Sequence, residues 1–293
     1  MGIIFLIVSI LFFVSIFLTF RIFDYYKINN PQAIIINYAI ASLVSYFFYK
    51  GDIPLSTVST LDWFPYSAVL GVLFMLSFLL FAISTQKAGI AITSVASKMS
   101  VLIPVFLGAY LYEYETLNTV KIVGLILSIV SFYLIFKKEK TEEFDIRKII
   151  LPFFIFLFSG ANDSLLKYIR EMFFKSSEIN LDHEILFMGI LFSFSFISGL
   201  IILGTITIAK KEKFEFKTII AGTILGVINF FSVLTMFKAM GHFESSFFFP
   251  VFNVSIVGLS TLIGIILFKE KLSKTNKIGT VLALITILLL ALN

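Results

Sequence analysis

The chain has 293 residues, of which 59% are hydrophobic and only 14% are charged, with a mean hydropathy of +1.02. A water-soluble domain of this size does not sustain such a composition, so the sequence predicts a polytopic membrane protein without a sizeable soluble domain. The lack of cysteine excludes disulfides and thiolate chemistry, and we expect no cofactor and no metal site. The net charge of +5 is typical of loops at an anionic membrane surface and does not indicate nucleic-acid binding.

Ten apolar windows lie between charged or turn-rich segments of the chain. Each approaches the roughly 20 residues that a helix needs to cross a bilayer, which is too long for a buried strand. The first window lacks the basic leader and the small-residue cleavage site of a signal peptide, and we interpret it as a span. The predicted spans cover residues 2–20, 33–49, 64–86, 90–112, 118–136, 149–170, 185–209, 218–237, 244–268 and 277–293. The predicted fold is an all-α integral membrane protein with ten transmembrane helices.

The two halves of the chain resemble each other around the charged middle connection. A shift of 155 residues superposes Glu115 on Glu270, and a shift of 151 superposes Gly71 on Gly222. Because five is an odd number, two five-helix halves in tandem have opposite orientations, which makes them an inverted repeat. We expect a first repeat over residues 1–137, a charged linker over 138–148 and a second repeat over 149–293.

Basic residues are distributed unevenly between the two sides of these ten spans. Sixteen of the 23 lysines and arginines fall in loops that follow odd-numbered spans, and six fall on the other side. The positive-inside rule therefore places the odd-numbered loops in the cytoplasm and both termini outside.

Lys98 is predicted to lie near the middle of the membrane, about nine residues into the fourth span. The shift of 155 pairs it with Asn253, at the depth where inverted-repeat transporters usually hold substrate. Pro104 and Pro250 lie nearby and free backbone carbonyls by interrupting the helical hydrogen bonds. We interpret Lys98 as a site for a carboxylate or phosphate; the alternative is a structural lysine that bonds carbonyls or snorkels.

The sixth predicted span contains Asn162, Asp163 and Lys167. Asp163 is the one carboxylate well inside a predicted span, which makes it a candidate for proton or cation coupling or for the counter-charge to Lys98. Asp163 and Lys167 are four residues apart and face the same side of a helix, so an internal ion pair is the alternative.

Asparagines in the other spans complete the candidate substrate site, which we expect chiefly between the fourth, sixth, eighth and ninth spans. Asn37 and Asn229 join Asn253 and Asn162 as candidates, although helix-to-helix hydrogen bonding is the commoner use of such amides. Most of the 37 phenylalanines are expected to face lipid. Glu115 and Glu270 are assigned an architectural role near the start of the helix that follows each of them.

Two short acidic junctions, residues 112–117 and 269–273, each precede the fifth span of a half. Together with the five-plus-five plan, they make the whole chain resemble the EamA-like branch of the drug/metabolite transporter superfamily. The resemblance implies a transporter that often exports amino acids or other small metabolites. It also implies cytoplasmic termini, whereas the basic-residue count places them outside, and both orientations stay open.

Function follows as a prediction from these features. We expect a secondary active transporter that moves a small anionic or zwitterionic metabolite, such as an amino acid, by alternating access, with export favoured by the resemblance. Clustered magnesium-binding acids, a span histidine and a phosphate-binding GxxxxGK[ST] loop are all lacking, so an enzyme or an ATP-driven motor is not expected. A lipid-modifying enzyme, a scaffold and a passive channel remain the alternatives. The predicted location is a bilayer, most readily a bacterial cytoplasmic membrane, with the choice between monomer and homodimer open.

Overall fold

A computed structural model describes residues 2–101, 147–174, 181–209, 213, 215–242, 245–270 and 272–291, together with scattered positions between 103 and 134. Within these ranges the chain is helical and contains no strand. Seven of the described helices are long and apolar enough to cross a membrane. The prediction of an all-α, multi-pass membrane protein is therefore confirmed.

The described helices other than α4 follow the predicted spans to within a few residues. Three predictions lie wholly or largely outside the described residues. Glu115 is not described, and only a few positions of the span predicted over 118–136 and of the linker over 138–148 are. The helices are α1 (Gly2–Tyr25), α2 (Asn30–Phe48), α3 (Phe64–Ala88), α4 (Ile90–Lys98), α7 (Arg147–Phe173), α8 (Leu181–Ala209), α9 (Phe216–Met240), α10 (Ser245–Phe268) and α11 (Lys274–Ala291), with short 3₁₀ turns η1 (Leu55–Thr60) and η2 (Met99–Val101).

Local sequence signals set several helix starts. The Asn29 side chain accepts a hydrogen bond from the Gln32 amide at 3.1 Å and so caps α2. Ser273 and Asn276 bond to each other's backbone amides at 3.0 and 3.1 Å, which is a reciprocal cap at the start of α11. Gly89 separates α3 from α4 with φ at +92°, a conformation that favours glycine.

The fourth predicted span differs from the expected single helix over 90–112. The α-helix ends at Lys98, and Met99–Val101 form a 3₁₀ turn. Pro104 lies just beyond this turn. Proline has no N–H to donate to the carbonyl four residues earlier, and its ring clashes with that carbonyl. Lys98 therefore lies at a change of helix type, where carbonyls lose their usual partners.

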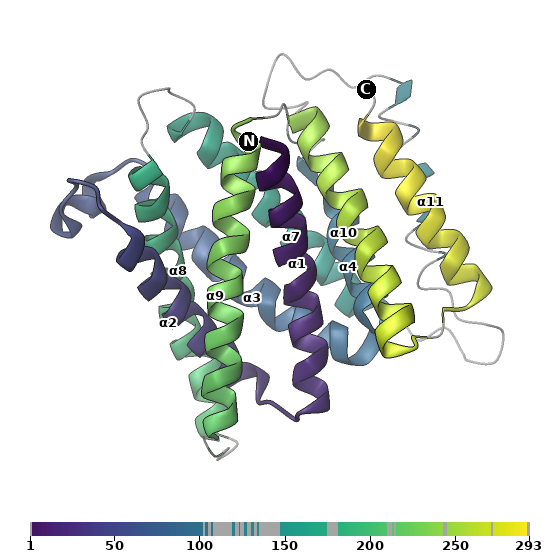
Figure 1. The fold of residues 1–293 in the computed structure, drawn as a ribbon, viewed down its shortest axis with the longest axis horizontal. Helices are drawn as coiled ribbons and strands as arrows, with labels where there is room; N and C mark the ends of the chain where they lie inside the picture. Colours follow the sequence, from purple (N-terminus) through teal and green to yellow (C-terminus); the bar gives the residue numbers. More distant parts are fainter. Residues whose placement is uncertain are drawn as a thin grey trace.

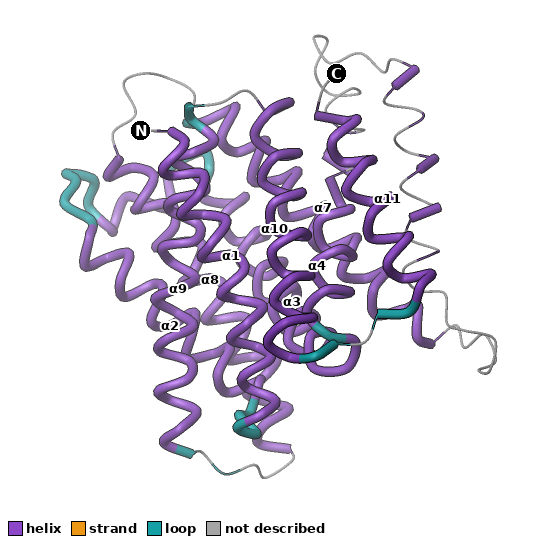
Figure 2. Tube along the Cα trace, turned by 45° about the vertical axis from the view of Figure 1, so that its right-hand side comes forward, coloured by secondary structure: helices purple, strands orange, loops and turns teal. Residues whose placement is uncertain are grey.

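Helices of the two halves interleave around a common centre (Figures 1 and 2). α2 packs between α8 and α9, α1 packs on α9, and α3 packs on α8 and α7. α4 contacts both α10 and α7, while α11 lies at the edge against α10. The centre of the bundle is consequently formed by α1, α3, α4, α7 and α9.

Apolar side chains cover much of the exterior, as a lipid-facing surface requires. Ile4, Leu11, Phe47 and Ile266 are each more than half exposed. In the described part of the chain, fourteen phenylalanines are buried, five are exposed and the others are half-buried, so many of the rings contribute to packing between helices. The buried rings pack edge-to-face and tilted against one another between helices, as in the Phe20–Phe78 and Phe187–Phe237 pairs.

Glycines permit the closest helix crossings. A Cβ atom on Gly222 of α9 would lie 2.8 Å from the Ala33 carbonyl of α2, and one on Gly71 of α3 would lie 2.8 Å from the Leu191 carbonyl of α8. Gly226 approaches the Asn37 carbonyl of α2 in the same way. The Gly222-x-x-x-Gly226 pattern therefore serves packing within the bundle.

Replacing Gly222 by leucine is expected to lower the free energy of unfolding by about 1–3 kcal/mol, because α2 must move away from α9. Gly204 of α8 is the matched control, since a Cβ atom there would meet nothing within 4 Å. Thermal unfolding of the two leucine variants in detergent measures the difference. Equal unfolding temperatures would contradict the close α2–α9 crossing.

Candidate functional site

One face of α7 carries three of the polar side chains that line the bundle centre. Ser159, Asn162, Asp163 and Leu166 are spaced as i, i+3, i+4 and i+7, which places them on one side of a helix. α3 has the same spacing at Phe74, Ser77, Phe78 and Phe81. The two stripes face a shared interior, because α3 and α7 pack against each other.

A cavity of about 50 Å³ lies between these stripes. Five of the described helices line it. The lining residues are Phe13 and Ile16 of α1, the α3 stripe, Ser97 and Lys98 of α4, the α7 stripe, and Asn229, Val233 and Met236 of α9. In chain order these are the first, third, fourth, sixth and eighth predicted spans. The expected helices are thus partly correct: α1 and α3 also contribute, whereas none of the described side chains of α10 lines the cavity.

The Lys98 ammonium is held by aromatic rings. Its side chain is 4% exposed, and Nζ lies 4.5 Å from the centroid of Phe13 and 5.0 Å from that of Phe252. Phe13 and Phe252 meet edge-to-face at 5.1 Å and so brace each other. Cation–π contacts stabilise a desolvated ammonium by about 2 kcal/mol without neutralising it. Among the described residues, no carboxylate forms a direct ion pair with Lys98.

Asp163 is the acidic group that faces Lys98. Both residues line the cavity, and their opposite charges attract each other across it. Lys167 is buried but does not line the cavity. Of the roles predicted for Asp163, that of a counter-charge to Lys98 therefore matches its position.

Hydroxyl groups fix the α7 stripe against its neighbours. Asn162 Nδ2 donates to Ser77 Oγ of α3 at 2.7 Å, and the hydroxyls of Ser97 and Ser159 lie 3.1 Å apart. The Asn162 Oδ1 atom is buried without a hydrogen-bond partner. An unpartnered carbonyl beside the Asp163 carboxylate makes the α7 side of the cavity rich in acceptors.

The remaining predicted amides lie in two different settings. Asn229 lines the cavity and donates to Asn37 Oδ1 at 3.3 Å, which ties α9 to α2. Asn37 is fully buried and is not a lining residue. Asn253 of α10 is 1% exposed and follows Phe252, and neither polar atom of its side chain has a partner.

A larger cleft of about 410 Å³ opens at the end of the bundle where α1 ends and α9 begins. Three of its four charged lining residues have local counter-ions, since Lys27 lies 3.6 Å from Asp24, and Glu215 lies 2.7 Å from Lys217. In the central cavity, the buried Lys98 and the half-buried Asp163 form no direct ion pair with any residue that the structure describes. We therefore take the central cavity as the candidate site.

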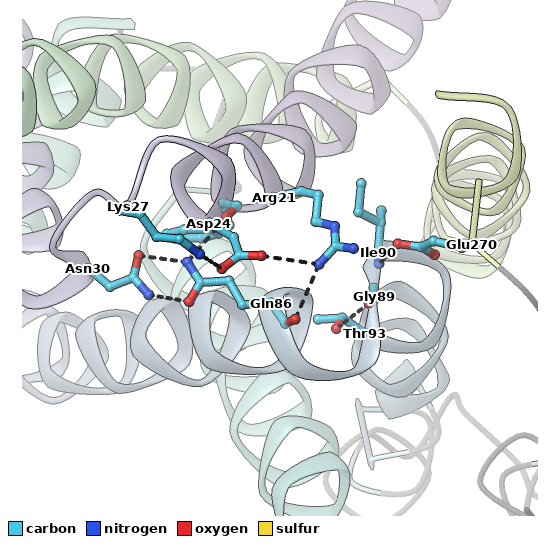
Figure 3. Close-up of polar contacts among 10 residues, drawn as sticks. Arg21, Asp24, Lys27, Asn30, Gln86, Gly89, Ile90, Thr93 and Glu270 are labelled. Carbon is cyan, nitrogen blue, oxygen red and sulfur yellow. Dashed lines mark hydrogen bonds and ion pairs between the residues drawn. The ribbon is translucent and has the colours of Figure 1, made fainter. Parts of the chain in front are cut away.

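Polar contacts fasten the helices at this same end (Figure 3). The side-chain amides of Asn30 and Gln86 bond reciprocally at 2.9 and 3.1 Å. Arg21 donates to the Gln86 carbonyl at 3.2 Å and lies 3.7 Å from Asp24. α1, α2 and α3 are thereby joined into one unit.

The Glu270 carboxylate contacts α4, not the helix that follows it. Glu270 accepts hydrogen bonds from the Ile90 and Ala91 amides at 2.8 and 3.3 Å (Figure 3). The expectation that Glu270 stabilises the start of the following helix, α11, is wrong, because the reciprocal Ser273–Asn276 cap already occupies that position.

Sequence reasoning missed the α3 stripe and the aromatic clamp on Lys98. The i, i+3, i+4, i+7 spacing of Phe and Ser on α3 was the available signal, but a phenylalanine stripe is also what lipid contact produces. No group of three or more metal-binding side chains occurs among the residues that the structure describes.

Comparison with known proteins gives a distant relative and a shared fold. No protein-family profile matches the chain. The chain is 27% identical over 287 residues to an uncharacterized protein of Haemophilus influenzae, covering 95% of this chain and 94% of that protein. A crystal structure superposes with a TM-score of 0.59 at 12% identity, covering 98% of this chain and 95% of that one. At this identity the superposition establishes the similarity of fold alone.

Proposed function

We propose that the protein is a secondary active transporter that moves a small zwitterionic or anionic metabolite by alternating access. The observation that carries this proposal is the pair of opposite charges that face one buried cavity without a direct ion pair. Buried charges are costly unless they are compensated, so a site with separated charges is best completed by a ligand of complementary charge. Lys98 would take the carboxylate of the substrate, while Asp163 and the free Asn162 carbonyl would take its ammonium group.

The helix arrangement supports a fold of ten helices in two inverted repeats. If α1, α2, α3 and α4 correspond to α7, α8, α9 and α10, each contact between halves has a counterpart: α1–α9 with α7–α3, α2–α9 with α8–α3, and α1–α10 with α7–α4. α2–α8 and α4–α10 are their own counterparts. The sequence shift of 151 superposes Gly71 on Gly222. Gly71 permits the close α3–α8 contact, and Gly222 permits the equivalent α9–α2 contact. Two-fold related halves of this kind are typical of secondary transporters.

The small cavity volume supports an alternating-access cycle. About 50 Å³ holds a few water molecules and not a metabolite, so a substrate would enter only after the helices separate on one side. The resemblance to EamA-like transporters favours export of an amino acid or a related metabolite. We place the protein in a bacterial cytoplasmic membrane, with the basic loops that follow odd-numbered spans on the cytoplasmic side by the positive-inside rule.

Counterflow in proteoliposomes tests the proposal. The purified protein is reconstituted, the vesicles are loaded with one of a panel of unlabelled amino acids and small carboxylates, and uptake of the labelled compound is followed. A carrier is expected to give saturable uptake that rises above the equilibrium level only when the vesicles are preloaded. Uptake that is linear in concentration would indicate a channel, and no uptake across the panel would contradict transport of this substrate class.

A further inference from the structure

We propose that the Glu270 carboxylate is a latch between the two halves of the chain that closes the bundle at the end where α4 begins. This inference rests on the proposed alternating-access function and names the contact that controls one side of the path. Glu270 follows α10, in the second half, and binds the first amides of α4, in the first half. Figure 3 places it beside Ile90 and Gly89, at the junction of α3 and α4.

Glycines from both halves form the seat of the carboxylate. A Cβ atom on Gly89 would lie 2.7 Å from Glu270 Oε1, and one on Gly264 of α10 would lie 2.5 Å from Oε2. The Glu270 amide donates to the Gly264 carbonyl at 3.0 Å, and Lys269 has φ at 52°, which turns the chain back toward α4. A hydrogen bond thus fixes the backbone of Glu270, and the two glycines enclose its carboxylate.

The bond is strong only while water is kept away from it. The first amides of a helix have no partner within the helix, and a carboxylate there gains a charge-assisted bond and a favourable helix dipole. Ile90 and Ala91 are at most 1% exposed, so the amides that bind the carboxylate belong to buried residues. Separation of α4 from the α10 end would expose these amides, and water would then replace the carboxylate. The latch therefore favours the state in which this end is closed.

α4 connects the latch to the candidate site. The helix runs for nine residues from Ile90 to Lys98, about 12 Å at the usual helical rise. Its first residue is bound by Glu270, and its last carries the ammonium that faces Asp163. A second contact joins the halves at the same end, where the Arg21 guanidinium lies 5.8 Å from the ring centroid of Phe268. A movement of α4 that releases Glu270 would also move Lys98 relative to α7.

A single-cysteine reporter tests the latch, because the natural chain has no cysteine. Ser159→Cys places a thiol in the cavity lining. A membrane-impermeant maleimide is added to right-side-out and to inside-out vesicles, with and without Glu270→Ala. We expect Glu270→Ala to raise the labelling rate about tenfold from the side where α4 begins and to lower it from the opposite side, because one of two states loses its charge-assisted bonds.

Matched variants separate a latch from a helix cap that matters only for folding. Gly264→Ala is expected to act as Glu270→Ala does, because its Cβ atom would lie 2.5 Å from Glu270 Oε2 and so displace the carboxylate. Glu215→Ala is the control at the same end, where the carboxylate binds the exposed Lys217, and it should leave both labelling rates unchanged. Glu270→Gln, which keeps one acceptor, is expected to give an intermediate rate even if the alanine variant does not fold.

Two results would overturn the latch. Unchanged labelling in Glu270→Ala and Glu270→Gln would mean that the contact does not set access, and a rise from both sides would mean general loosening of the bundle. The labelling needs no substrate, so it is independent of the proposed transport activity. Counterflow by the wild type together with unchanged labelling would refute the latch alone. The expected rise from one side and fall from the other, without counterflow by the wild type, would refute the proposed substrate class alone.

Discussion

Lys98→Gln is expected to lower the transport rate at low substrate concentration about 10- to 100-fold, the loss that follows from removing one charge-assisted hydrogen bond. Among the residues that the structure describes, Lys98 carries the one cation that lines the central cavity, and Phe13 and Phe252 hold it without neutralising it. Its positive charge is therefore available to a substrate carboxylate. Counterflow by variants at matched protein levels in proteoliposomes measures the effect.

Lys87→Gln is the control for this variant. Lys87 lies in the last turn of α3, is exposed to solvent and does not line the cavity, so its loss should leave transport unchanged. Lys98→Arg keeps the charge on a longer, planar group and should retain part of the activity, with a higher KM. Transport by Lys98→Gln at the wild-type rate would refute the binding role and leave Lys98 as a structural lysine.

The double variant Lys98→Met/Asp163→Leu is expected to be inactive, yet more stable than the wild type by about 1–4 kcal/mol, because apolar groups of similar volume avoid the desolvation cost of two buried charges. A pair of charges kept for packing would behave in the opposite way and lose stability on replacement. The single variants Lys98→Met and Asp163→Leu should each be less stable than the double variant, because each leaves one buried charge without its opposite.

Thermal unfolding of the four proteins in detergent gives the stability order, and counterflow gives the activity. A double variant that unfolds at a lower temperature than the wild type would contradict a functional origin for the charges. Asp163→Asn adds a separate test of coupling. If its transport keeps the wild-type dependence on a pH gradient, Asp163 is a counter-charge to Lys98 and not the coupling site.

The membrane fold could be predicted from the sequence because its cause is local composition. An apolar window of about 20 residues has few alternatives to a membrane helix, since a backbone in lipid must satisfy its own hydrogen bonds. The same reasoning gave the depth of Lys98, because the rise per residue of a helix is fixed. The end of the α-helix at Lys98 lies six residues before Pro104, and that proline was visible in the sequence as a helix-interrupting residue.

The partners of each polar group could not be predicted in the same way. Asp163 had two candidate cations, Lys167 on its own helix and Lys98 on another, and spacing along one helix allowed a pair with Lys167 but could not decide between the two. Only the tertiary structure brings α4 to α7 so that Lys98 and Asp163 share the cavity. Likewise, a stripe of phenylalanine on α3 has the same sequence pattern whether it faces lipid or the cavity.

Composition and periodicity thus determined which segments cross the membrane and which unusual polar groups they carry, because these depend on neighbours in the chain. Only the packing of the two halves decided that Glu270 binds the start of α4, that Phe13 and Phe252 enclose Lys98, and that α1 and α3 line the cavity. Each of these contacts joins helices that are far apart in the sequence. Helix-to-helix contacts in lipid depend on shape and hydrogen bonding between surfaces, which no pattern within one helix specifies.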